Sequence, residues 1–490
     1  MYNIFDKLKN YSDSDYYAFH MPGHKRNLDL MDGISPYLID ITEIDGFDDL
    51  HHAEGILKEA QERAAEVYHA DETHFLVNGS TVGILSAILG TTEKGDSILV
   101  ARNCHKSVYH AIYLNELDPV YLYPKFDTEQ GLSTEIDAAD VQKALEEHPK
   151  IRAVMIVSPT YDGVVSDIEK IAEIVHAKGC PLIVDEAHGA HFGFDPYFPK
   201  SANIYGADLV INSLHKTLPA LTQTALLHVN GDMVKRRKVK QYLDMLQTSS
   251  PSYILMASID ACIGMLEETL ETHSDARSDY KYKNKNIFSE YANRIEALRK
   301  DLKRLKYLKI IQTDNTDRYD RSKFVISVKH APMSSHELYE ILLHRYHLQM
   351  EMLAGTYVLA MTTVGDTQEG LDRLRDALLE IDKEIDTKQG RPAAIETDLP
   401  LSGRQPALEK VWTIAEAVNR RDKIQKRSFE DSIGCISVEY AYLYPPGSPL
   451  IVPGERITKE AVEVLHWYQE HDFSIEGLQS EDGIEVWIDG

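Results

Sequence analysis

Three clusters of polar residues in the sequence each lie at the end of a short apolar run of the kind that forms a buried strand. They are NGST at 78–81, DEAH at 185–188 and SLHK at 213–216. In an open α/β sheet, ligands bind at the carboxyl ends of the strands, so these side chains are candidates for one common site. Their types are complementary, since they comprise hydroxyls, carboxylates, imidazoles and one lysine.

Each cluster meets one demand of a pyridoxal-phosphate site. Ser80 and Thr81 precede VGILSAIL, and hydroxyls with backbone N–H groups at a helix start can hold a phosphate; an ordinary helix N-cap uses the same residues. Asp185 can pair with a protonated ring nitrogen, because a nearby carboxylate favours the charged heterocycle. Lys216, once desolvated in a cleft, becomes nucleophilic toward an aldehyde. A lone lysine is usually a solvated surface residue, so the prediction depends on the three clusters together.

Other polar patterns carry weaker signals. His105, after the apolar run SILVA, could stack on a cofactor ring, and it equally fits an ordinary helix start. DEAH also spells the Walker B signature of a helicase class, but the GxxxxGK[ST] loop which that class requires is absent from the sequence. The paired histidines of HMPGHK (20–25) and HGAH (188–191) do not fit HExxH, so no metal site is expected.

The overall composition is that of a globular protein. The formal net charge of −26 argues against a nucleic-acid binder, whose phosphate contacts need clustered Lys and Arg. No run of eighteen uncharged apolar residues predicts a transmembrane helix, and the N-terminus has no apolar segment typical of a signal peptide. The four cysteines lie far apart and form no CxxC pair. We therefore expect a cytoplasmic protein with no nucleic-acid or membrane partner.

Strand-like runs alternate with helical segments between residues 55 and 270. The runs lie at 73–78, 97–101, 120–124, 152–158, 181–186, 207–213 and 224–229. Helical periodicity occupies 55–70, 138–148 and 167–179, the last with a glycine that fits a C-cap. Apolar strands separated by helices indicate βαβ units. The fold class is therefore predicted to be α/β, with a mainly parallel seven-stranded sheet covered on both faces.

At 490 residues the chain is too long for one compact domain. We predict five parts: an N-terminal segment (1–54), a large cofactor-binding domain (55–275), a small α/β domain (276–386), a linker (387–406) and a C-terminal domain (407–490). A long helical region (252–308) is expected to lead out of the large domain. The linker is rich in Pro, Gly and Thr. A helix near 407–427 and a Pro-rich loop at 444–455 are expected in the C-terminal domain.

At these motifs the sequence closely resembles the small-type ornithine/lysine/arginine decarboxylase family, which has the aspartate aminotransferase fold (fold type I). The resemblance covers essentially the whole chain. In its compact form, the chain is most similar to biosynthetic arginine decarboxylases. It is carried by FHMPGHK (19–25), DDLHHAEG (48–55), NGST (78–81), RNCHKS (102–107), SPTYDG (158–163), DEAHGAH (185–191), SLHK (213–216) and YPPGSPLIVPGE (444–455). Two places depart from the family pattern: Leu443 replaces a common Pro, and Thr217-Leu218 replaces a common Leu–Gly or Leu–Leu pair.

The resemblance implies a role for each matched residue. Lys216 would hold pyridoxal 5'-phosphate as a Schiff base, Asp185 would pair with the pyridine nitrogen, and His105 would stack on the ring. His188 would lie near the ring and the departing carboxylate, and Thr160 would contact the phenolic oxygen. The phosphate would be held by Ser80, Thr81, Ser213 and His215.

Partners and assembly are further implications of the resemblance. Family members pair as homodimers or form higher homo-oligomers, with active sites at the interface. HMPGHK (20–25) and the Glu439–YPPG region are therefore candidates to complete a site, either in their own chain or in the other subunit. Because FHMPGHK begins at residue 19, the extra N-terminal domain of the large inducible decarboxylases is not expected, nor is assembly into large rings.

The reaction that the resemblance implies is decarboxylation of a basic amino acid to its amine and CO2, in polyamine biosynthesis. Arginine is favoured as the substrate, followed by lysine or ornithine. Asp185 would keep the pyridine nitrogen charged, and Lys216 or His188 would return a proton to Cα. Glu439 is the candidate partner for the cationic side chain of the substrate, although an exposed structural glutamate fits the sequence equally.

Two alternatives remain open at this level. One is an aminotransferase or lyase of the same fold, and the sequence leaves open whether an aminotransferase-type arginine would hold the substrate carboxylate; the candidates are Arg318, Arg321 and Arg373. The other is a catalytically silent protein that binds pyridoxal phosphate. The complete set of Lys216, Asp185 and His105 favours an enzyme.

Overall fold

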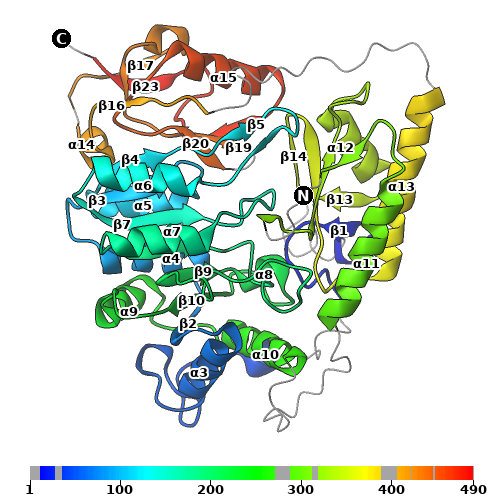
Figure 1. The fold of residues 1–490 in the computed structure, drawn as a ribbon, viewed down its shortest axis with the longest axis horizontal. Helices are drawn as coiled ribbons and strands as arrows, with labels where there is room; N and C mark the ends of the chain where they lie inside the picture. Colours follow the sequence, from blue (N-terminus) through cyan, green and yellow to red (C-terminus); the bar gives the residue numbers. More distant parts are fainter. Residues whose placement is uncertain are drawn as a thin grey trace.

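The structure is a computed structural model that describes residues 11–27, 36–270, 287–311, 318–387, 405–420, 422–444 and 447–488. Figure 1 shows a large central sheet with the C-terminal strands stacked above it. A smaller sheet lies to one side, flanked by the long helices α11 (Ile287–Leu302) and α13 (Gln368–Thr387). The chain thus surrounds the edge of the large sheet with two further layers of structure.

The largest sheet has seven strands, in the order β2-β10-β9-β8-β7-β3-β4. Their bounds are Glu72–Leu76, Ala225–Val229, Leu209–Asn212, Leu182–Asp185, Ile151–Val157, Ser97–Ala101 and Asp118–Leu122. The pairs from β9 to β4 are parallel, whereas β10 runs antiparallel to both β9 and β2. All seven predicted runs overlap these strands. The α/β fold class and the mainly parallel seven-stranded sheet are confirmed.

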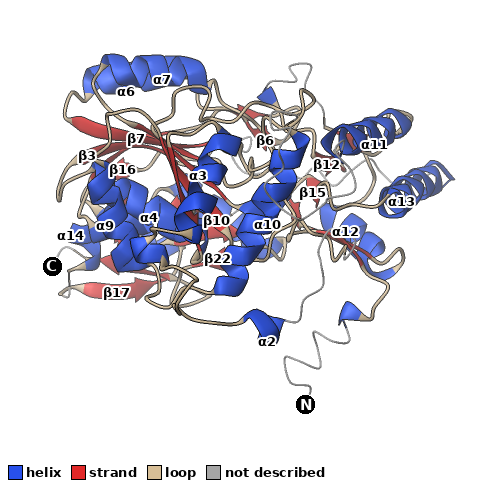
Figure 2. Cartoon of the chain, turned by 90° about the horizontal axis from the view of Figure 1, so that it is seen from below, coloured by secondary structure: helices blue, strands red, loops and turns tan. Residues whose placement is uncertain are grey.

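Helices cover both faces of this sheet. Helices α6 (Ala138–Glu147) and α7 (Ile168–Ala177) lie on one face, and α4 (Gly79–Thr91) and α9 (Arg236–Leu246) lie on the other (Figure 2). Helix α5 (Lys106–Leu114) packs against α4, and α3 (Ile56–Tyr68) packs against α10 (Tyr253–Thr269). Because water reaches neither face, every residue of β8, β9 and β10 is buried, which explains their mainly apolar sequences.

The predicted helices of the large sheet are confirmed, including the glycine that ends α7. Gly179 follows the C-cap with φ of +72°, a left-handed conformation that glycine adopts without strain. The expected helical region 252–308 corresponds to α10 and α11, and residues 271–286 lie outside the described residues.

A second sheet of four antiparallel strands has the order β11-β12-β15-β14. The bounds are Lys309–Ile310, Lys323–Ser327, Tyr357–Met361 and Met352–Ala354. Helix α12 (Ser335–His344) starts with a capping box of Ser334 and Glu337. This part of the chain thus contains both strands and helices, as expected for the small α/β domain proposed at 276–386. In addition, β1 (Tyr17–Phe19) pairs in parallel with β13 (Leu348–Met350), which brings the N-terminal segment beside the second sheet.

The C-terminal part contains a five-stranded sheet, β16-β21-β18-β23-β17, and a three-stranded sheet, β20-β19-β22. The bounds of the five are Glu409–Lys410, Glu455–Arg456, Ile436–Ser437, Ile484–Trp487 and Ile424–Arg427, and those of the three are Ser448–Ile451, Ala441–Tyr444 and Ser474–Glu476. Helix α15 (Lys459–Glu470) belongs to the same unit. The short elements elsewhere are α2 (Pro36–Ile39), α8 (Leu214–Thr217), β5 (Phe126–Asp127) and β6 (Leu132–Ser133).

Two predictions for the C-terminal part are wrong. The helix expected near 407–427 is instead β16, the five-residue helix α14 (Ile414–Val418) and β17. Strand β17 forms because it pairs with β23, about sixty residues later, so long-range pairing overrides the local pattern. The expected loop at 444–455 contains β20, and Pro449 is tolerated there because β20 is an edge strand. Pro445 and Pro446 lie outside the described residues.

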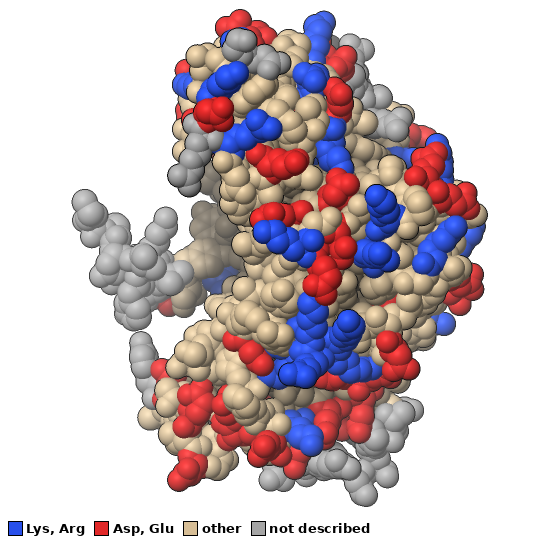
Figure 3. Space-filling model, turned by 90° about the vertical axis from the view of Figure 1, so that its left-hand side faces the viewer, with Lys and Arg blue, Asp and Glu red and all other residues tan. Residues whose placement is uncertain are grey.

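The remaining expectations concern domains and surface. Apart from residues 387, 405 and 406, the predicted linker (387–406) lies outside the described residues, and the domain boundaries stay predictions. Among the described residues, no helix has both the length and the apolar character needed to cross a bilayer. On the face drawn in Figure 3, Lys and Arg side chains are flanked by Asp and Glu side chains, in keeping with the net charge of −26.

Candidate active site

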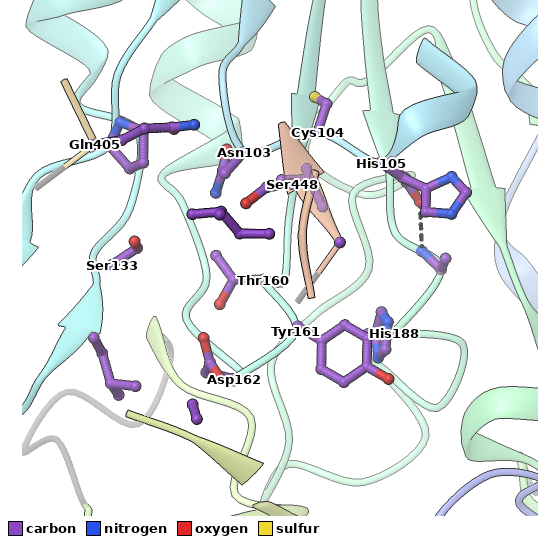
Figure 4. Close-up of a pocket in the computed structure, with 18 of the residues that line it drawn as sticks. Asn103, Cys104, His105, Ser133, Thr160, Tyr161, Asp162, His188, Gln405 and Ser448 are labelled. Carbon is purple, nitrogen blue, oxygen red and sulfur yellow. Dashed lines mark hydrogen bonds between the residues drawn. The ribbon is translucent and has the colours of Figure 1, made fainter. Parts of the chain in front are cut away.

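A cavity of about 550 Å³ lies where the strands of the large sheet end. Its walls come from the loops after β2, β3, β7, β8 and β9, from the second sheet and from the C-terminal sheets (Figure 4). The residues predicted from the sequence to bind the cofactor all line it: Ser80, Thr81, His105, Thr160, Asp185, His188, Ser213, His215 and Lys216. The rule that ligands bind at strand ends therefore brought together residues from the ends of five strands of one sheet.

The turn from β2 into α4 forms one end of the cavity. Gly79 begins the helix with φ of +72°, and the first-turn N–H groups of any helix lack intrahelical acceptors. The hydroxyls of Ser80 and Ser213 are hydrogen-bonded to each other at this point. His215 Nδ1 donates to the carbonyl oxygen of Thr224 at 2.9 Å, which fixes its ring at the cavity wall. Hydroxyls, an imidazole and a helix N-terminus together form a surface suited to a phosphate.

Lys216 lies on α8, the single helical turn that follows β9. Its Nζ atom is 3.0 Å from His188 Nε2. Desolvation lowers the pKa of the Lys216 amine, and the nearby carboxylate of Asp185 opposes that shift. Desolvation, reinforced by the charge of Lys216, also holds the pKa of His188 well below its usual range. The pair therefore consists of a neutral imidazole and an amine that gives up its proton more readily than a surface lysine.

Asp185 ends β8 and is 3% exposed. Its Oδ1 atom accepts the backbone N–H of Ala187 at 3.1 Å, and no other donor among the described residues reaches the carboxylate. Desolvation raises the pKa of Asp185, and the positive charge of Lys216 lowers it. The Cys104 thiol feels the same carboxylate, since burial and Asp185 together raise its pKa well above the usual value. A buried carboxylate with one neutral donor is suited to a cationic partner such as a protonated ring nitrogen.

His105 and Thr160 complete the part of the cavity that the sequence predicted. His105 is the N-cap of α5, where its Nδ1 accepts the backbone N–H of Ser107 and lies 2.8 Å from the Ser107 hydroxyl. Desolvation lowers the pKa of His105 to about 4, so the ring is uncharged at neutral pH and suited to stacking on an aromatic ring. The Thr160 hydroxyl accepts the N–H of Val164 at 3.0 Å, which leaves its own hydrogen free to donate into the cavity.

The opposite end of the cavity contains residues that the sequence did not predict. In Figure 4, His105 and His188 lie on one side of the view, Ser133 and Gln405 lie on the other, and Thr160 and Asp162 lie between them. Asp162 is 7% exposed and accepts a hydrogen bond from the hydroxyl of Tyr357. The loop SPTYDG follows β7, so the strand-end rule that identified Asp185 would also have identified Asp162.

Glu439 does not line the cavity of its own chain, and its expected role toward the substrate stays a prediction. It lies between β18 and β19, where its two oxygens accept the backbone N–H groups of Gln479 and Glu485 at 2.9 and 2.7 Å. Its carboxylate is therefore used to join C-terminal strands within this chain. None of the arginines considered for an aminotransferase lines the cavity: Arg318, Arg321 and Arg373.

The two segments proposed to complete a site occupy different positions in this chain. Gly23 of HMPGHK donates its N–H to the carbonyl oxygen of His215 at 2.7 Å, so that segment lies against the Lys216 turn without lining the cavity. The YPPG region does reach the cavity, through Gly447 and Ser448. Within the described residues, no group of three or more His, Cys, Asp or Glu side chains is arranged to hold a metal ion.

Sequence comparisons place most of the chain in known families. Residues 3–341 match the profile of the Orn/Lys/Arg decarboxylase major domain, and residues 404–486 match that of the Orn/Lys/Arg decarboxylase C-terminal domain. A Bacillus subtilis protein named YaaO is 36% identical over 470 residues, covering 94% of this chain and 93% of that protein. A Bacillus subtilis arginine decarboxylase is 31% identical over 471 residues, covering 94% of this chain and 92% of that enzyme.

Solved structures with the same fold include two lysine decarboxylases. The constitutive lysine decarboxylase of E. coli matches with a TM-score of 0.77 and 20% identity, covering 99% of this chain and 81% of that one. The Francisella novicida lysine decarboxylase LdcF matches with a TM-score of 0.76 and 18% identity, covering 98% of this chain and 80% of that one. At these identities the likeness shows a shared fold.

Proposed function

The chain belongs to the Orn/Lys/Arg decarboxylase family, and from this premise we propose that it is a pyridoxal-phosphate-dependent carboxy-lyase whose preferred substrate is arginine. The family assigns the reaction class, which is decarboxylation of an amino acid. The observation that carries the cofactor proposal is the 3.0 Å contact of Lys216 with His188 in the same cavity as Asp185. The preference for arginine is supported by relatives named arginine decarboxylase that match over more than nine-tenths of the chain.

The residues present fit the cofactor, because each functional part meets a suitable group. Lys216 offers an amine of lowered pKa for the aldehyde, and Asp185 offers a buried carboxylate for the ring nitrogen. The uncharged ring of His105 offers a stacking surface, and Thr160 offers a hydroxyl for the phenolic oxygen. The phosphate would be held by Ser80, Thr81, Ser213 and His215. When bound, the cofactor supplies an electron sink for the pair left on Cα as CO2 departs.

The chain's own residues supply charge and protons for that chemistry. Asp185 holds a fixed negative charge in a buried setting, where such a charge acts more strongly than in water. Lys216 and His188, within hydrogen-bond distance of each other, can store and return a proton at Cα once the carboxylate has left. Since the pKa of His188 is held well below its usual range, its ring accepts a proton only transiently, and Lys216 is the principal donor in this proposal.

We also propose a cellular location, a pathway and an oligomeric state for the enzyme. We place it in the cytoplasm, in polyamine biosynthesis, as a homodimer with active sites near the subunit interface. An exposed apolar group on one stretch of the chain supports the dimer; it consists of Leu38, Ile44, Phe47 and Ile56. These side chains would be buried by a second subunit, as large exposed apolar groups are at protein interfaces.

The test is to incubate the purified protein and pyridoxal phosphate separately with arginine, lysine and ornithine, and to identify the amine products by mass. The expected result is CO2 and the amine of arginine at the highest kcat/KM. A visible absorbance from bound cofactor should be lost in Lys216→Ala. Transfer of nitrogen to a keto acid without CO2 would make the protein an aminotransferase, and no product from any basic amino acid would overturn the proposal.

A further inference from the structure

Asp162 is held firmly in a loop that begins beside Asp185. The loop follows β7, whose last residue is in register with Asp185 on β8. Ser158 donates its N–H to the carbonyl oxygen of Asp185 at 3.0 Å, and the N–H of Gly163 closes a turn onto the carbonyl of Thr160 at 3.0 Å. Because both ends of the loop are bonded, the Asp162 side chain has a defined position at the cavity wall.

The carboxylate of Asp162 is buried, and no cation among the described residues is hydrogen-bonded to it. Tyr357 donates its hydroxyl to Oδ1, which fixes the orientation of the carboxylate but brings no positive charge. The cation whose charge lowers the pKa of Asp162 is Lys323. Its Nζ is 3.6 Å from Asp320 Oδ2 and makes no hydrogen bond to Asp162. Burial raises the pKa of Asp162 to about 6. A buried carboxylate in this state is stabilised by any cation that enters the cavity.

Asp185 and Asp162, the two carboxylates that line the cavity, have different charged neighbours. The charge of Lys216 lowers the pKa of Asp185, whereas the charge that lowers the pKa of Asp162 is Lys323. Lys216 is the sole Lys or Arg among the described residues that line the cavity. A basic amino acid that reaches Lys216 with its α-amino group therefore has one unassigned carboxylate for its side chain, which is Asp162.

We infer that Asp162, oriented by Tyr357, receives the positively charged end of the substrate side chain and so sets the preference for basic amino acids. This inference rests on the proposed function. A guanidinium suits the position best, because its planar donors match a carboxylate and leave further N–H groups for neighbouring acceptors. One such acceptor is the Thr356 hydroxyl, which lines the cavity, is buried and has no hydrogen-bond partner among the described residues.

The test compares a charged ligand with its neutral counterpart on the holoenzyme. 4-Aminobutylguanidine, the amine that arginine decarboxylation yields, and 4-aminobutylurea, which has the same shape and the same terminal ammonium but a neutral urea in place of the guanidinium, are titrated calorimetrically into wild type and Asp162→Asn. Loss of one partner of a buried charge pair should weaken guanidine binding by at least about 30-fold. Binding of the urea should change little, because its urea group carries no charge for Asp162 to pair with.

Asp382→Asn is the matched control, since Asp382 is equally buried, accepts the backbone N–H groups of residues 306 to 308 and lies outside the cavity. Its ligand affinities should equal those of wild type even where its thermal stability falls. Tyr357→Phe, which removes one neutral hydrogen bond, should weaken guanidine binding by about 2- to 10-fold.

The outcomes separate this inference from the proposed function. Equal losses for the guanidine and the urea in Asp162→Asn, or no loss for either, would overturn the role of Asp162. Absence of CO2 production by wild type would overturn the proposed reaction while the binding comparison could still be read. In steady-state assays the expected pattern is a raised KM for arginine in Asp162→Asn, with kcat reduced much less.

Discussion

The two ends of the cavity differ in how the chain builds them. At the Lys216 end, every candidate residue follows a strand of one sheet, so short motifs in a single domain place all of them. At the Asp162 end, the walls come from the loop after β7, from Thr356 and Tyr357 of the second sheet, and from residues of the C-terminal part such as Gln405. The first end is built from the strand ends of one sheet, whereas the second depends on contacts between that sheet, the second sheet and the C-terminal part.

The difference also appears in the electrostatics of the two carboxylates. Asp185 has a resident cation in Lys216, which opposes the rise in its pKa caused by burial. Asp162 has a tyrosine hydroxyl as its hydrogen-bond donor, and its pKa rises to about 6. In our proposal, the reaction steps common to every substrate therefore take place beside Asp185 and Lys216, whose opposite charges lie close together. In our proposal, selection among substrates depends on Asp162, whose carboxylate pairs with the cationic side chain of the substrate.

Lys216→Ala should have the largest effect of all, because it removes both the proposed cofactor attachment and the proton donor. We expect amine production from arginine to fall by about 10⁴-fold. Mass spectrometry of the product and the visible absorbance of bound cofactor measure the two losses. Retention of both the absorbance and the activity would show that this end of the cavity does not hold the cofactor.

Arg102→Ala should destabilise the protein where the C-terminal part meets the large sheet, and so affect the Asp162 end of the cavity more than the Lys216 end. Arg102 Nη2 lies 2.8 Å from Glu455 Oε2, and both side chains are fully buried where the large sheet meets the C-terminal part. Removing one partner leaves a buried charge and should lower the free energy of unfolding by about 3–5 kcal/mol. Denaturant titration measures this loss. The Arg102→Met, Glu455→Met double variant should recover most of the lost free energy of unfolding. In Arg102→Ala, KM for arginine should rise by a larger factor than the affinity for the cofactor falls.

Asp185→Asn should affect the reaction step rather than substrate binding. Loss of the fixed charge at the proposed ring nitrogen should lower kcat by about 10²- to 10³-fold. KM for arginine should change little, since Asp185 does not face the substrate side chain in this proposal. A pre-steady-state measurement of CO2 release tests the step directly, and a raised KM with unchanged kcat would contradict the division of roles.

The pH dependence of arginine use gives the smallest predicted effect. Asp162 must be a carboxylate to receive a cation, and its pKa is about 6 in the free enzyme, so kcat/KM should fall about tenfold for each pH unit below 6. Tyr357 does not titrate in this range because burial raises its pKa well above the usual value. The buried cation of Lys323 is present in both variants, so a flattened profile in Asp162→Asn isolates the carboxylate. An unchanged profile in that variant would assign the titration to another group.

The cofactor end of this protein was largely predictable from the sequence, and the substrate end was only partly so. The apolar runs before Asp185 and Lys216 predicted parallel strands, and parallel strands end at the same edge of a sheet. Local sequence patterns were therefore enough to predict that these two residues lie near each other. Asp162 obeys the same rule and was open to prediction. Its partner Tyr357 was not, because it lies 195 positions later on β15 of the second sheet, whereas Asp162 lies in the loop after β7.

The C-terminal part shows most clearly what only the tertiary structure decided. Segment 424–427 has no pattern that predicts a strand, and it becomes β17 through pairing with β23. Glu439 has the right charge for a basic substrate, yet it accepts two backbone N–H groups and does not line the cavity. The sequence by itself determined the fold class, the strand ends and the candidate lysine, because periodicity and apolar runs are local properties. Which carboxylate faces the cavity depends on how separate sheets dock, and docking is decided by contacts between residues hundreds of positions apart.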